Sequence, residues 1–135
     1  MAGSISIKRN IYDRRIRTMI LLCTSDASGD VSGNPIPVPG GTFYNFGYIP
    51  VSGASDLWDI VIPMTYPLDD GNSISLADIL NGDGANLSNS TNGGWVSLTN
   101  PCVAIENSIV TPTISNLGNA QSVYLLLHFW EEAYF

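Results

Sequence analysis

The sequence predicts an all-β fold: a single antiparallel β-sandwich, jelly-roll-like, of about 7-8 strands with one short helical turn. Three observations favour this class. The 135 residues include 13 Gly and 8 Pro, which is typical of a loop-rich β protein. Short apolar runs recur between turn residues, and no strand–helix alternation is present. Only 13% of the residues are charged, which disfavours a coiled coil or an ordinary cytosolic enzyme. A closed β-barrel is the alternative.

The first strands are predicted from two different patterns. Ser4–Lys8 alternates, with Ile5 and Ile7 on one face. Met19–Thr24 is continuously apolar, so we expect a strand that is buried on both faces or covered by a neighbouring subunit. The Pro-rich stretch within Ser25–Thr42 predicts an extended, unpaired backbone, in a long loop or an edge crossing rather than a hairpin.

The middle of the chain predicts two strands, a helical turn and a loop. Phe43–Val51 is aromatic-rich, and its Gly47 indicates a bulge or a close backbone approach. Leu57–Tyr66 has strand character that Pro63 interrupts. Ser75–Leu80 is the helical candidate, because Ser75 and Asp78 have capping-box spacing. Asn81–Gly94 is expected to be an exposed loop.

The C-terminal part predicts four strands. Three are short: Trp95–Thr99, Cys102–Glu106 and Ile109–Ile114. Asn116–Asn119 has the composition of a hairpin turn. Gln121–Trp130 is apolar on both alternating faces, so we expect a central strand that is buried on both sides.

The charge distribution divides the chain into a basic N-terminal arm, residues 1–17, and a β-sandwich domain, residues 18–135. The arm has a net charge of +4, because it contains all five basic residues of the chain and one acid, Asp13. The remaining residues hold eleven of the 12 acids and no Lys or Arg, in a chain whose net charge is -7. The basic residues of the arm are Lys8, Arg9, Arg14, Arg15 and Arg17.

This polarity predicts assembly contacts between the arm and the acidic bodies of neighbouring subunits. Two alternatives remain open. Nucleic acid or an anionic membrane would bind the arm weakly and with steep salt dependence. A solvated terminal segment with no partner is the other alternative.

Targeting and redox features are few. The apolar run Met19–Cys23 is too short for the hydrophobic region of a signal peptide. No stretch is long enough to span a bilayer. We therefore expect a soluble chain without a signal peptide. Cys23 and Cys102 are expected to be buried free thiols, with a disulfide between them as the alternative.

No motif predicts catalysis, a metal or a cofactor. Asn81–Asn86 resembles a calcium loop but departs from the EF-hand pattern at three positions. A looser calcium site of Asp78, Asn81 and Asp83 is the alternative, whereas turn chemistry explains these residues more simply. His128 lies in an apolar strand and is expected to be a core or interface histidine. We predict that the protein is not an enzyme, with a small hydrolase that uses His128 as the third hypothesis.

The predicted function is that of a structural protein in a symmetric assembly, a homo-oligomer or a shell of several subunits. A viral capsid component (coat, decoration or vertex protein) fits best, in a virion or an extracellular assembly. The alternative is a carbohydrate- or receptor-binding β-sandwich module. Its ligand-facing aromatics would be Tyr44 or Trp95, and the loops Ser25–Thr42 and Asn81–Gly94 would form the rim.

Overall fold

The computed structural model describes residues 3–32, 34–77, 83–104 and 107–131. Within these residues the secondary structure is entirely β. The strands are β1 (Ser4–Asp13), β2 (Ile16–Thr24), β3 (Ile36–Val38), β4 (Gly41–Pro50), β5 (Asp59–Val61), β6 (Met64–Pro67), β7 (Ser73–Ala77), β8 (Gly94–Ala104), β9 (Ser108–Val110), β10 (Thr113–Ser115) and β11 (Ser122–Trp130).

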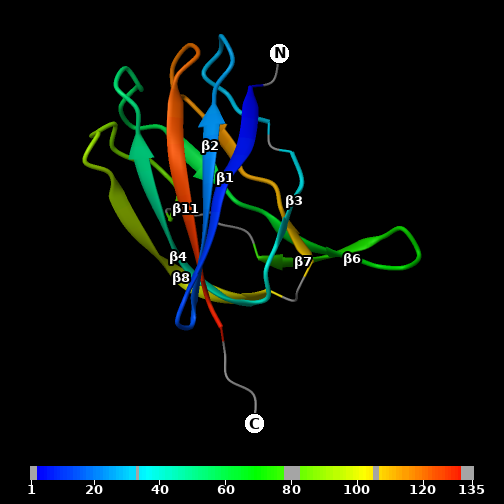
Figure 1. The fold of residues 1–135 in the computed structure, drawn as a ribbon. Coiled ribbons are helices and arrows are strands. Elements are labelled where there is room, and N and C mark those ends of the chain that lie inside the picture. Colours follow the sequence, from blue (N-terminus) through cyan, green and yellow to red (C-terminus); the bar gives the residue numbers. More distant parts are fainter. Residues whose placement is uncertain (1–2, 33, 78–82, 105–106, 132–135) are drawn as a thin grey trace.

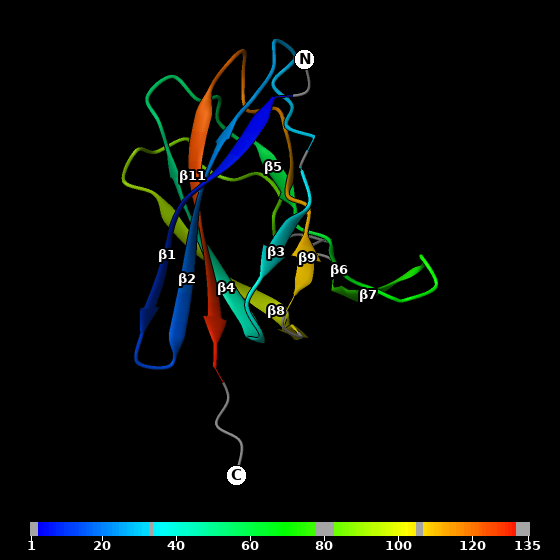
Figure 2. The ribbon, with the colours of Figure 1, turned by 45° about the vertical axis from the view of Figure 1, so that its right-hand side comes forward.

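The strands form an antiparallel β-sandwich. One layer is a five-stranded sheet in the order β1-β2-β11-β4-β8. The opposite layer contains a four-stranded sheet, β3-β9-β6-β7, and the pair β10-β5. Figure 2 shows the two layers beside each other, and Figure 1 shows that the β6–β7 hairpin projects away from the body.

Alternation along the strands builds the core between the layers. The inward residues of β11 have no exposed surface, and they are Val123, Leu125, Leu127 and Phe129. Phe129 stacks on Phe43 of β4, with ring centroids 5.1 Å apart. The opposite layer contributes Trp58, Ile60 and Met64, of which none is more than 2% exposed. The predicted sandwich and the central position of β11 are confirmed.

The predicted arm is placed within the five-stranded sheet. Residues of β1 pair with β2 from Ser4–Thr24 to Asp13–Ile16, with a register irregularity between Ile7 and Arg9. Arg14 adopts a left-handed φ of 59° in the turn that joins the two strands. The basic residues therefore lie on an edge strand, on a hairpin turn and at the start of β2, rather than on an extension that leaves the domain.

Several predicted elements need correction. The helical turn at Ser75–Leu80 is wrong over its described part, because Ser75 lies in β7 and pairs with Thr65; residues 78–80 lie outside the described residues. A local capping pattern was outweighed by pairing with β6. The unpaired backbone expected near Pro37 is also wrong, since Pro37 is in the edge strand β3 and pairs with Ile109. An edge strand tolerates proline because one side needs no N–H donor.

The number of strands is larger than expected for a physical reason. Pro63 separates β5 from β6, and Pro112 separates β9 from β10, so single predicted strands become two that belong to different sheets. Conversely, two predicted strands merge into β8. The predicted hairpin at Asn116–Asn119 is instead a crossover, because β10 pairs with β5 while β11 lies in the five-stranded sheet.

Candidate binding face

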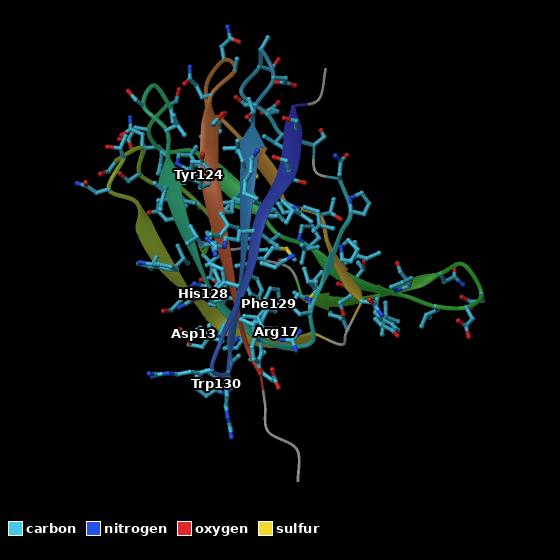
Figure 3. The ribbon with its side chains drawn as sticks, viewed as in Figure 1. Asp13, Arg17, Tyr124, His128, Phe129 and Trp130 are labelled. Atoms are coloured by element: carbon cyan, nitrogen blue, oxygen red, sulfur yellow. The ribbon has the colours of Figure 1, made fainter. Side chains whose placement is uncertain are left out.

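The outer face of the five-stranded sheet is the surface on the side away from the core. Alternation and register place on it the residues of β2, β11, β4 and early β8 that are not buried. The sequence predicted β11 to be buried on both sides, but Tyr124 and Trp130 on this face are 37% and 45% exposed. Figure 3 shows Tyr124, His128 and Trp130 in succession along β11. This face is uncovered within the described chain.

An aromatic platform lies on this face. Trp95 is 59% exposed, and its indole lies against Gly47 of the neighbouring strand, in register with it. The indole also contacts the imidazole of His128, with centroids 4.8 Å apart and planes at 43°. Residues of three strands thus position the exposed indole of Trp95. The indole can lie there because any side chain at position 47 would fill the space that it occupies.

Tyr44 reaches the same point from β4. A register shift between Phe43 and Asn45 interrupts the β4–β8 pairing at this residue. The Tyr44 ring lies 6.2 Å from the ring of His128. The two predicted ligand-facing aromatics therefore converge on His128, which the sequence predicts to be a core or interface histidine. We call Tyr44, Trp95 and His128 the aromatic platform.

Polar groups without charge lie beside the platform. Asn45 pairs in register with His128 on one side and with Ser97 on the other. Asn45 Oδ1 is buried and has no hydrogen-bond partner among the described residues. Burial lowers the pKa of His128, so the imidazole is neutral at pH 7. The platform is thus an uncharged site with unused hydrogen-bonding capacity.

The other part of the outer face is aliphatic. Leu22 pairs with Tyr124, and Tyr124 pairs in turn with Ile49. In the next row Ile20 pairs with Leu126. Ile49 is 41% exposed. We call the four aliphatic residues, together with Tyr124 between them, the aliphatic patch. Contiguous exposed apolar surface of this kind is typical of interaction sites.

The loops predicted as a rim are separated by the fold. The segment Ser25–Thr42 crosses to the opposite layer, where Val31 forms a bridge with Ile114. Leu87, within Asn81–Gly94, is buried and forms a bridge with Trp58, so this loop is partly anchored in the core. Its last residue leads directly into Trp95. The candidate site therefore lies on a sheet face rather than between loops.

The other predicted residues have structural surroundings. Asp83 accepts hydrogen bonds from the backbone N–H and the hydroxyl of Thr99, at 3.1 and 2.8 Å; Asp78 and Asn81 lie outside the described residues. In the described part of the chain, no group of three or more His, Cys, Asp or Glu is arranged to hold a metal. Cys23 is a buried free thiol, as predicted, and burial raises its pKa to about 12.

One further property concerns membranes. A helix with the length and apolar character needed to cross a bilayer is not found among the described residues.

Comparison with known proteins gives likeness to solved structures but not to sequences. No protein-family model and no curated protein sequence matches the chain. A solved chain described as "Structural basis for the promiscuous specificity of the carbohydrate-binding modules from the beta-sandwich super family" is similar, with a TM-score of 0.42 and 14% identity. The match covers 98% of this chain and 55% of that chain.

Proposed function

We propose that the protein is a carbohydrate-binding β-sandwich module that binds neutral glycans on its outer face. The observation that carries this proposal is the position of Trp95. Its indole is 59% exposed, yet contacts with Gly47 and His128 fix its position. An aromatic ring that is ordered before binding loses little conformational entropy when a ligand stacks on it.

The chemistry of the platform matches a sugar ring. One face of a pyranose presents C–H groups that pack on an indole, while its hydroxyls need hydrogen-bond partners. Asn45 and Ser97 lie in register beside the platform and bring polar groups to it. The outward residues of β2, β11, β4 and early β8 include no Asp, Glu, Lys or Arg. This composition favours neutral over acidic glycans.

Affinity electrophoresis followed by calorimetry against glucan, xylan and mannan oligosaccharides tests this proposal. We expect one neutral glycan class to bind, with loss of binding in Trp95→Ala. Trp130→Ala is the matched control, since Trp130 is exposed on the same sheet outside the platform. No binding to any neutral glycan, or equal effects of the two variants, would contradict the proposal.

A second candidate, a subunit of a symmetric assembly such as a virion shell, is favoured by the aliphatic patch. Symmetric burial is the usual role of such a surface. In this candidate the neighbouring copy would cover the sheet face. The predicted roles of the basic residues toward acidic subunits or nucleic acid stay predictions.

Light scattering over a salt series separates the two candidates. An assembly formed through the aliphatic patch persists as salt rises, because salt screens charge and not apolar contact. Leu126→Ser would then dissociate it, whereas Trp95→Ala would not. A monomer at every salt concentration would contradict the assembly candidate and leave the glycan proposal intact.

A further inference from the structure

A cavity of about 500 Å³ lies between the β1–β2 hairpin and β3, and the residues of the aromatic platform do not line it. Its volume is within the range of small-molecule sites. Apolar groups come from Met19, Val38 and two prolines, and polar groups from Arg17, Tyr12 and two asparagines. Its lining includes Tyr12, Arg17, Met19, Val38 and Pro39.

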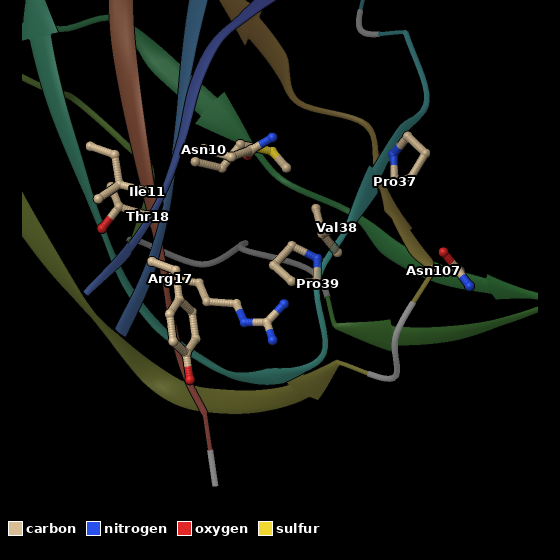
Figure 4. Close-up of a pocket in the computed structure, with 10 residues that line it drawn as sticks. Asn10, Ile11, Arg17, Thr18, Pro37, Val38, Pro39 and Asn107 are labelled. Atoms are coloured by element: carbon tan, nitrogen blue, oxygen red, sulfur yellow. The ribbon is translucent and has the colours of Figure 1, made fainter. Parts of the chain in front are cut away.

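The guanidinium of Arg17 contacts neighbouring side chains, but not all of its N–H donors have an acceptor. It lies 4.9 Å from the centroid of the Tyr12 ring, and Nη2 donates to Glu131 Oε2 at 3.5 Å. Its Nε is buried and has no hydrogen-bond partner among the described residues, whereas the side chain as a whole is 39% exposed. The guanidinium therefore has donor capacity beyond its one ion pair. Figure 4 shows the guanidinium extending toward Pro39 at the cavity wall.

The surrounding charge favours an anion with a single negative charge. Arg14 and Arg15 lie in the turn next to Arg17. Glu131 pairs with Arg17, and its pKa is lowered by a hydrogen bond from Tyr12 and by Arg17 and Arg15. Among the described residues, Glu131 and Asp13 offset two of these three cations. The remaining positive charge balances one carboxylate, whereas a phosphate dianion would exceed it.

We propose that this cavity binds a small monocarboxylate with an apolar tail. The carboxylate pairs with the guanidinium of Arg17, and the tail packs on Met19, Val38 and Pro39. This site is separate from the aromatic platform and does not depend on the proposed glycan binding.

Two probes test the charge requirement: hexanoate and its uncharged analogue hexanamide, titrated into the full chain by NMR. We expect hexanoate to shift resonances of Arg17 and Met19 and to bind at least about tenfold more tightly than hexanamide. Equal binding of the two probes, or no shift at millimolar hexanoate, would overturn the proposal.

Three variants test the donor. Arg17→Gln and Arg17→Lys should each weaken hexanoate binding about tenfold, because lysine keeps the charge but lacks the planar fork of N–H donors. Arg14→Gln removes the same charge from the turn and should change affinity less than about twofold. An Arg14→Gln effect as large as that of Arg17→Gln would show that general charge, and not this cavity, binds the anion. If Arg17→Gln fails to fold, the comparison of Arg17→Lys with Arg14→Gln decides the matter.

Discussion

The indole of Trp95 covers the position where Gly47 would carry a side chain. A Cβ built on Gly47 would lie 2.5 Å from Cζ3 and 2.7 Å from Cε3 of Trp95. Gly47 does not have a left-handed φ, so glycine is needed here for space and not for backbone conformation. The pair thus couples a backbone position in β4 to the orientation of an exposed ring in β8.

Gly47→Ala is expected to abolish glycan binding while leaving the domain folded. The new methyl group must displace the indole, and Trp95 can turn into solvent because it is already exposed. We expect a change in the free energy of unfolding of less than about 1 kcal/mol. Urea denaturation and calorimetry on the same sample measure both effects. Retained binding in Gly47→Ala would show that the orientation of Trp95 is unimportant.

Gly84→Ala, in contrast to Gly47→Ala, is expected to lower the stability of the domain. A Cβ at Gly84 would collide with the backbone carbonyl of Ile60, and the Ile60 N–H donates to the Gly84 carbonyl at 2.7 Å. Backbone cannot move aside as an exposed side chain can. We expect a loss of at least about 2 kcal/mol in urea denaturation. A Gly84→Ala midpoint equal to that of the wild type would refute this packing.

Trp58→Phe should destabilise the core by about 1–3 kcal/mol. Trp58 is fully buried, its Nε1 donates to the Ser88 carbonyl at 3.0 Å, and its ring meets Tyr48 edge-on at 5.5 Å. Phenylalanine removes the donor and leaves a void. Thermal unfolding checks the value, with the exposed Trp130→Phe as the control. Similar losses in both variants would contradict the assigned burial.

His128 should make stability depend on pH near neutrality. Burial lowers its pKa from 6.5 in the folded state, so the unfolded chain takes up the proton first. The free energy of unfolding should therefore fall as the pH decreases through about 6.5. His128→Asn removes this component, and the chain has one His. Urea midpoints for both proteins across this pH range measure it. A pH dependence that is unchanged in the variant would contradict the assignment.

The sequence predicted most of the architecture because alternation is a local signal. The inward residues of β11 and the extended character of β4 follow directly from the pattern. Sheet membership does not, since Pro63 marks a break but not the sheet that each half joins. The prediction of a helical turn at Ser75 was wrong because the capping-box spacing carries no information about the pairing of Ser75 with Thr65.

The candidate site was predictable only in part. Exposed aromatics were expected at Tyr44 and Trp95, but their convergence on His128 depends on the β11-β4-β8 order, which three separate sequence segments do not reveal. The sequence predicted a bulge or a close backbone approach at Gly47 but not that Trp95 is its partner. The cluster of basic residues was evident from the sequence. The pairing of β1 with β2 and the cavity lined by Arg17 became evident only from the strand register of the structure.

The most direct test of the central claim uses the indole N–H resonances of the three tryptophans during a glycan titration. We predict that the Trp95 signal shifts saturably, while the buried Trp58 signal stays in place and Trp130 moves little. Saturable binding that leaves the Trp95 signal unmoved, or that moves Trp130 alone, would contradict the assignment of the aromatic platform as the glycan site.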